Sequence, residues 1–244
     1  MAKFVWFSLF LVGALGTLAA QPTLWKPKPK DANAIRAFLV TGGHDHDVEF
    51  YSVFDDPAIQ TMVEPHPQAF GGDLRKRVDV LVLYDMMRSL DEKRRANLRN
   101  FVESGGKGVV VLHHAIGDNV DWPWWYEEVV GGRYLFEPVN GKASSYKHDE
   151  EQTIRVALEH PITKGLGTFR LLDETYKDLW ISPRVQVLLK SDNLTSDGPV
   201  AWISPYEKAR VVYIQLGHDR NANLHPKYRQ LVRNAIRWVA GRTP

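Results

Sequence analysis

The sequence contains no cysteine, and this absence excludes several kinds of site at once. Without a thiol the chain cannot form disulfides, thiolate metal sites, iron–sulfur clusters or a cysteine nucleophile. Charge of one sign is not in excess either, because 31 basic and 29 acidic residues leave a net charge of +2. This balance gives no electrostatic reason to expect nucleic acid as a partner. Neither G-x-G-x-x-G nor G-x-x-x-x-G-K-[ST] occurs, so the sequence predicts no nucleotide cofactor.

Long hydrophobic runs are confined to the first twenty residues. Lys3 is followed by an uncharged, mostly apolar run from Phe4 to Leu18, and then by the small residues Ala19 and Ala20. This pattern predicts a signal peptide over residues 1–20 and export to the periplasm or the cell exterior. The alternative is an uncleaved anchor, but the run is shorter than the roughly 20 residues that span a bilayer. No later stretch is long and apolar enough, so we expect no stable membrane anchor.

The rest of the chain predicts one α/β domain over residues 34–241, preceded by an extended tether over residues 21–33 that is rich in proline and lysine. Continuous apolar runs are typical of strands buried on both faces, as in a mostly parallel central sheet. The predicted strands are Ile35–Thr41, Val78–Tyr84, Val109–Leu112, Thr153–Leu158, Val185–Lys190, Val200–Ile203 and Arg210–Gln215. The spacing of apolar residues predicts helices over Asp91–Ser104, Pro123–Val130 and Leu224–Val239, and residues 131–150 are expected to form a loop.

The positions of the histidines are the most informative feature of the domain. Five of the nine histidines follow the end of a predicted strand. They are His44, His46, His113, His114 and His218. Because the carboxyl ends of parallel strands gather at one edge, where ligands bind, we expect these side chains to line a common cleft. The alternative is that each is a hydrogen-bonded loop histidine.

The segment from Val109 to Gly117 predicts a strand, a sharp turn and a helix, which is the geometry of a nucleophile elbow. Here the turn carries His113, and a histidine acts as a general base or a metal ligand rather than as a common covalent nucleophile. The alternative is a buried histidine that only contacts backbone groups.

Two carboxylate positions accompany the histidines. Glu174 and Tyr176 belong to an Asp-Glu-x-Tyr motif, and Asp219 adjoins His218. A carboxylate beside an imidazole can share acid and base duties or complete a metal shell. Together with His113, these residues are the predicted catalytic group.

A divalent metal such as zinc is predicted at the same edge, with His44, His113 and His218 as ligands and Glu174 as a further ligand or an acid–base partner. The spacing matches no diagnostic zinc signature, since no H-E-x-x-H occurs. The competing hypothesis leaves these histidines free of metal, with one of them as the general base.

Several motifs, in this order, resemble the ThuA-like (trehalose utilisation) family. They are TGGHDH, LHHA, WWYEEVVGG, HPITKGL, DETY and YIQLGHD, and they cover nearly all of residues 35–240. The resemblance implies a flavodoxin-like three-layer sandwich within the class I glutamine amidotransferase-like superfamily. It also implies a site built from His44, His113, Glu174, Tyr176, His218 and Asp219. The amidotransferases carry a cysteine at the elbow and this chain has none, so we expect no glutaminase activity.

Contacts to a sugar are expected from Gly43, His46, His114, Trp125 and Tyr146. Trp125 belongs to an aromatic cluster whose rings could stack on a sugar face, and Tyr146 and His148 lie in an SSYKHD segment that we expect to reach the site.

The family is linked to disaccharide use and to 3-keto-sugar metabolism. We therefore expect an exported enzyme, a lyase, isomerase or hydrolase, that acts on a sugar or keto-sugar by acid–base or metal-assisted chemistry. The alternative is a non-catalytic sugar-binding or accessory protein. Crowded titratable groups favour the enzyme, because binding a neutral sugar does not require an imidazole cluster.

Overall fold

The computed structural model describes residues 31, 33–86 and 89–243. The predicted signal peptide and residues 21–30 of the predicted tether lie outside the described residues. Among those that are described, no helix has the length and apolarity needed to cross a membrane.

The described part of the chain builds a nine-stranded mixed sheet and a separate two-stranded one. In the large sheet five neighbouring strands run parallel. They are, in spatial order, β2 (Ile59–Pro65), β1 (Ile35–Gly42), β3 (Val80–Asp85), β4 (Gly108–Leu112) and β11 (Arg210–Ile214). The remaining four continue from β11 in antiparallel pairs. They are β10 (Pro199–Ile203), β9 (Gln186–Ser191), β6 (Ser145–Val156) and β7 (Phe169–Lys177). The small sheet pairs β5 (Gly132–Arg133) with β8 (Trp180–Ile181).

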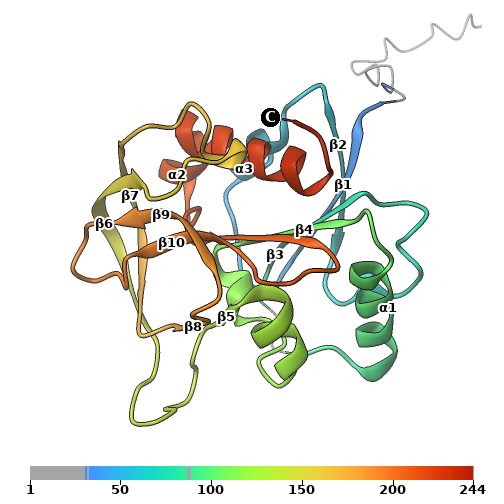
Figure 1. Ribbon diagram of the computed structural model, residues 1–244, viewed down its shortest axis with the longest axis horizontal. Helices are drawn as coiled ribbons and strands as arrows, with labels where there is room; N and C mark the ends of the chain where they lie inside the picture. The colour runs from blue at the N-terminus through green and yellow to red at the C-terminus, as the bar shows by residue number, and fades with distance from the viewer. Residues whose placement is uncertain (1–30, 32, 87–88, 244) are drawn as a thin grey trace, which may run out of the picture. The chain divides into compact units, whose positions relative to one another are not determined.

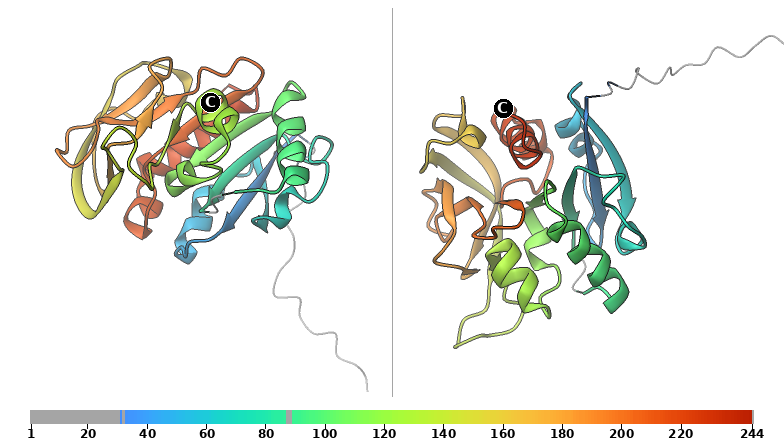
Figure 2. Two further views of the ribbon diagram at one scale, coloured as in Figure 1. Left: turned by 90° about the horizontal axis from the view of Figure 1, so that it is seen from below. Right: turned by 45° about the vertical axis from the view of Figure 1, so that its right-hand side comes forward.

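Helices cover both faces of the parallel half of this sheet. The α-helices of the described residues are α1 (Glu92–Glu103), α2 (Arg220–Leu224) and α3 (Pro226–Val239). On one face the apolar residues of α1 belong to the same hydrophobic cluster as Leu81 and Leu83 of β3, and on the other those of α3 belong to the cluster that contains Val80 and Val82 of the same strand. Figure 1 places α1 and α3 apart, with strands β3 and β4 between them, and Figure 2 shows them from two further sides. Successive residues of β3 are buried on opposite faces, which explains its uninterrupted apolar run.

Shorter helical turns connect the strands. Four are 3-10 turns and one is a π-helical turn. They are Val48–Phe54, Gln68–Phe70, His113–Gly117, Pro161–Thr163 and, as the π-helical turn, Trp124–Val130.

The structure differs from the sequence predictions mainly in the weakly apolar strands. β2 is an edge strand that was not predicted, because only its first residue is fully buried and no apolar run forms. Residues 145–150, expected as loop, form the first half of β6, which is mostly exposed and pairs with β7. The predicted parallel arrangement is found in the five strands that lie, in spatial order, from β2 to β11, and the four strands beyond β11 are antiparallel.

Candidate functional site

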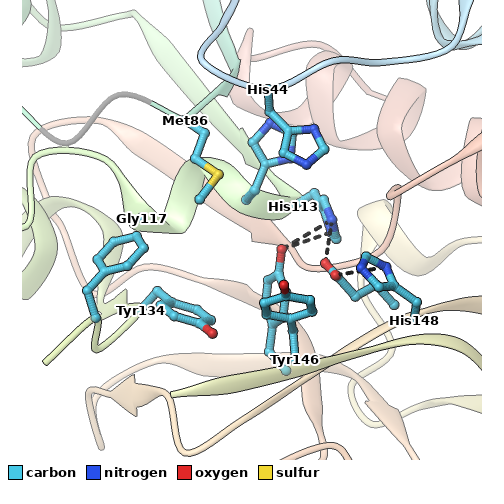
Figure 3. Close-up of a pocket in the computed structure, with 11 residues that line it drawn as sticks. His44, Met86, His113, Gly117, Tyr134, Tyr146 and His148 are labelled. Atoms are coloured by element: carbon cyan, nitrogen blue, oxygen red, sulfur yellow. Dashed lines mark hydrogen bonds and ion pairs between the residues drawn. The ribbon is translucent and has the colours of Figure 1, made fainter. Parts of the chain in front are cut away.

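The main cavity lies between loops that follow the parallel strands and two strands of the antiparallel half. The loops after β1, β3 and β4 reach it from one side, and β6 and β7 reach it from the other (Figure 3). Its volume is about 280 Å³. The lining residues are His44, Met86, His113, His114, Gly117, Tyr134, Phe136, Tyr146, His148, Glu174 and Tyr176.

Three side chains from three different elements converge beside this cavity. His113 Nε2 lies 3.0 Å from Glu174 Oε2 and 3.2 Å from His218 Nδ1, and His218 Nδ1 lies 3.7 Å from the same carboxylate oxygen. In the part of the chain that the structure describes, this is the group of histidine and acidic residues placed to hold a metal ion. We call it the His–Glu–His group. All three residues were among the predicted candidates, Glu174 as a ligand or acid–base partner, and the predicted ligand His44 is not part of the group.

The turn at His113 sets the orientation of its ring. The residue follows β4 directly and has a φ of 50°, a left-handed conformation that non-glycine residues adopt at a cost in strain. Its Nδ1 donates a hydrogen bond to the backbone oxygen of Gln215 at 2.6 Å. This bond keeps a proton on Nδ1, so Nε2, which is directed at Glu174 and His218, donates to the carboxylate when His113 is protonated and offers a lone pair when it is neutral. The strained turn is therefore the elbow expected from the sequence.

The buried His113–Glu174 pair shifts the pKa of each partner. Burial alone would lower the pKa of His113, but the hydrogen bond and charge of Glu174 outweigh it and raise that pKa. Burial alone would raise the pKa of Glu174, but the hydrogen bond and charge of His113 hold it below its usual range. Tyr176 places its hydroxyl 3.1 Å from His113 Nε2, and burial raises its pKa well above the usual value. Glu174 is thus ionised at neutral pH and Tyr176 is a neutral hydrogen-bond donor.

Two further histidines sit beside this pair. The ring of His114 stacks on that of His44 at 4.6 Å between centroids, and burial, followed by the nearby charge on His113, lowers the pKa of His114 to about 2. His114 is therefore neutral at physiological pH. His148 Nδ1 lies 3.2 Å from Glu174 Oε1, so the carboxylate contacts a buried histidine through one oxygen and a half-exposed histidine through the other.

The outer wall of the cavity is aromatic and apolar. Met86, Tyr134, Phe136 and Tyr146 line it, and Tyr146 is 58% exposed at the mouth. Sequence reasoning found Tyr146 but not the other three. They stand in loops or at strand ends with no periodic pattern, so their position depends on how the loops pack.

Two predicted residues lie elsewhere. Trp125 is only 1% exposed and packs in the hydrophobic core, away from the cavity lining, because the π-helical turn points its ring inward. Asp219 caps α2 by accepting a hydrogen bond from the backbone N–H of Asn221 at 2.8 Å. The carboxylate that contacts the His218 backbone is Asp173 instead.

Gly43 and His46 border a neighbouring shallow depression that shares His44 with the main cavity. The His46 ring contacts the hydroxyl of Tyr51 at 3.1 Å. Neither residue lines the main cavity, so their predicted contacts to substrate stay a prediction.

Comparison with known proteins shows to which family the chain belongs. The profile of a family described as ThuA, trehalose utilisation, matches residues 26–239. The chain belongs to the ThuA family. No curated protein matches it.

Solved structures that resemble this ThuA-family chain share its fold. A protein described as ThuA-like from Parabacteroides merdae ATCC 43184 is 19% identical with a TM-score of 0.72, covering 86% of this chain and 91% of that one. A second, from Bacteroides uniformis ATCC 8492, is 20% identical with a TM-score of 0.64, covering 90% and 95%. A β-galactosidase from Bacillus circulans sp. alkalophilus is 13% identical with a TM-score of 0.58 and covers 87% of this chain but 32% of its own. At these identities the likeness is one of fold alone.

Proposed function

We propose that this ThuA-family protein is an exported carbohydrate-processing enzyme that acts on a sugar or keto-sugar. The observation that carries the proposal is the convergence of His113, Glu174 and His218 beside a cavity with aromatic walls. Ionisable groups crowded at a cleft are the arrangement that proton transfer or metal-assisted chemistry needs, and a neutral ligand does not need it to bind.

The cavity supports a small carbohydrate as the substrate. Its volume of about 280 Å³ is just below the usual range of ligand sites, roughly 300–1,000 Å³, which suits a small substrate. The rings of Tyr134, Phe136 and Tyr146 offer apolar surfaces for the C–H faces of a sugar, while histidine and carboxylate groups stand opposite for its oxygens.

Each member of the site has a chemical role in this proposal. Glu174 is ionised and accepts a proton from a carbon or hydroxyl of the sugar. Tyr176 donates a hydrogen bond to the oxygen on which negative charge develops, and His113 donates one through Nε2 in its protonated form, which the neighbouring Glu174 favours. The buried positions of both groups keep water away from the reacting atoms.

The donor set also fits a divalent metal such as zinc. Two ligands at about 2.0–2.1 Å from one tetrahedral zinc ion are about 3.3 Å apart, and the three separations in the His–Glu–His group are 3.0, 3.2 and 3.7 Å. The hydrogen bond from His113 Nδ1 to a backbone oxygen is the second contact that zinc-binding histidines usually make. We propose His113, Glu174 and His218 as the residues that would hold the ion, and a bound ion would polarise a sugar carbonyl.

The test of this function is a substrate panel on purified mature protein. Sugars and their 3-keto derivatives are incubated with wild type, with Glu174→Gln and with the matched control Glu151→Gln, an exposed glutamate of β6 that pairs with Arg170. We expect turnover of at least one substrate by wild type and the control, and a loss of 100-fold or more in kcat for Glu174→Gln, in line with the magnitude of general acid–base catalysis. The same assays after EDTA treatment and zinc addition test the metal.

Binding without turnover across the panel would contradict the enzyme and favour the sugar-binding alternative. Turnover that EDTA leaves unchanged would support the metal-free acid–base route. Ammonia release from glutamine is expected in none of these samples, because the chain has no thiol to form the acyl intermediate.

The proposal also includes export of the protein and a three-layer fold. The charged, apolar and small-residue regions of residues 1–20 support export with cleavage near Ala19 and Ala20, which N-terminal sequencing of the protein recovered from its native cells tests. Recovery of intact Met1 from a membrane fraction would contradict cleavage. Helices on both faces of the parallel strands support the three-layer flavodoxin-like sandwich.

A further inference from the structure

Asp173 is a buried carboxylate that stands directly behind the His–Glu–His group. It lies on β7 next to Glu174 and is only 3% exposed. Its Oδ2 accepts a hydrogen bond from the backbone N–H of Gly217 at 2.8 Å, and its Oδ1 accepts from the backbone N–H groups of His218 at 3.0 Å and Glu174 at 2.9 Å. One side chain thus contacts the backbone of two members of the group.

The segment that Asp173 holds, Gln215–His218, also contacts the third member. The backbone oxygen of Gln215 accepts the hydrogen bond from His113 Nδ1 at 2.6 Å. The hydroxyl of Tyr84 donates to the backbone oxygen of Gly217 at 2.8 Å from another side. All three members of the group are therefore fixed relative to a stretch of four residues.

Gly217 shows how tightly this segment is confined. Its φ is 123°, and a Cβ placed there would lie 2.2 Å from the hydroxyl oxygen of Tyr228. The segment has no room to shift toward α3, so its position is decided by the bonds that it makes to Asp173 and Tyr84.

We propose that Asp173 is the positioning residue of the site. It sets the distance between Glu174 and His218 by binding the backbone of both. The inference rests on the proposed function, and it adds a residue that touches neither the substrate nor the ion. It also explains why the carboxylate next to His218 in sequence, Asp219, is not the one that orients it: Asp219 caps α2.

A carboxylate is needed at this position because three N–H groups point at it. Both oxygens of an ionised aspartate accept hydrogen bonds, whereas an asparagine has one accepting oxygen and an NH₂ group that donates. In Asp173→Asn the NH₂ group would face an N–H donor. With the NH₂ group in place of Oδ1 the backbone of Glu174 and His218 must move away, and with it in place of Oδ2 the backbone of Gly217 must do so.

The experiment compares Asp173→Asn with Asp219→Asn in the full mature protein. Zinc is titrated into each by calorimetry, at a temperature where thermal unfolding shows every variant to be folded. We expect wild type and Asp219→Asn to bind zinc alike and Asp173→Asn to bind at least tenfold more weakly. Equal affinity in Asp173→Asn would overturn the proposal.

Two further variants separate positioning from loss of stability. Leu231→Ala removes a buried core side chain of α3 that is not a member of the group, and should lower the melting temperature without changing zinc affinity. Tyr84→Phe removes the hydroxyl that donates to the backbone oxygens of Gly217 and His218 but leaves the Asp173 carboxylate in place, and it should weaken zinc binding less than Asp173→Asn does. If Leu231→Ala lowers the zinc affinity as much as Asp173→Asn at a similar melting temperature, the effect is one of stability and the proposal is wrong.

Crystal structures of wild type, Asp173→Asn and Asp219→Asn test the positioning role of Asp173 without relying on zinc binding. If wild type binds no zinc, the metal part of the proposed function fails, and the role of Asp173 is then decided by the distance from His218 Nδ1 to Glu174 Oε2. We expect this distance to increase in Asp173→Asn and to stay unchanged in Asp219→Asn. An unchanged distance in Asp173→Asn would refute the positioning role whatever the metal result.

Discussion

His66 and His113 are both buried histidines that contact a carboxylate, and they serve different ends. His113 contacts Glu174 at the cavity, whereas His66 Nδ1 lies 2.5 Å from Asp85 Oδ2 between the ends of β2 and β3. Both side chains of the second pair are about 1% exposed. Because a buried carboxylate and imidazole are each costly to leave without a partner, this pair contributes to stability rather than to the chemistry of the site.

Asp85→Ala should therefore destabilise the protein strongly. Removing one partner of a buried pair leaves the other unsatisfied, which typically costs about 3–5 kcal/mol. Chemical denaturation measures the free energy of unfolding. The control is Glu151→Ala, which breaks an ion pair whose side chains are about three-quarters exposed and should cost about 1 kcal/mol or less. A similar small loss in both variants would contradict the structural role of the His66–Asp85 pair.

Two helical elements of this protein begin at a histidine cap. His225 Nδ1 accepts a hydrogen bond from the backbone N–H of Lys227 at the start of α3, and His160 Nδ1 accepts from the backbone N–H of Ile162 at the 3-10 turn Pro161–Thr163. Only a neutral imidazole nitrogen accepts such a bond. The cap at His225 also explains why α3 begins at Pro226, two residues after Leu224, where the apolar pattern predicts its start.

These caps predict a loss of stability at acid pH. Burial lowers the pKa of both His160 and His225 below the unfolded value of about 6.5. A lowered folded pKa contributes stability that is present above about pH 6.5 and lost as the pH falls through the folded pKa.

The double variant His160→Asn, His225→Asn keeps a capping side chain that does not titrate. Its free energy of unfolding should therefore fall less than that of wild type between pH 7.5 and pH 5, measured by urea denaturation. An identical pH dependence in the two proteins would show that the caps are not responsible.

At the level of the whole molecule, the parallel half of the sheet depends on the close approach of α3. Gly108 begins β4, and a Cβ placed there would lie 2.5 Å from both the backbone oxygen and the Cβ of Val239 at the end of α3. The same strand leads directly into the turn at His113. Packing of the helix on the sheet and the position of the site are thus connected through five residues of β4.

Gly108→Ala should destabilise the protein by about 1–3 kcal/mol, the usual cost of overpacking a tight contact. Thermal unfolding followed by circular dichroism measures the shift. Gly72→Ala is the control, because a Cβ at Gly72 meets nothing within 4 Å, and its melting temperature should stay within a degree or two, about 0.5 kcal/mol. Equal melting temperatures for both variants would show that α3 does not pack this closely.

Much of the parallel half could be predicted from the sequence. The runs that became β1, β3 and β4 are buried on both faces, and burial of that kind is recorded locally as consecutive apolar residues. The histidines at the ends of these strands were equally visible, since the edge at which parallel strands end follows from their direction. The order of the motifs was sufficient to indicate the family.

The partners of those histidines were decided by the tertiary structure. His113 meets Glu174 although β11, β10, β9 and β6 stand between β4 and β7 in the sheet, and the pairing of these weakly apolar strands is not recorded in local patterns. For the same reason, the carboxylate that holds His218 is Asp173 on β7 and not Asp219 beside it. Sequence patterns report how each segment is buried. Which distant side chains meet depends on the register and order of the strands, and these are settled only when the sheet forms.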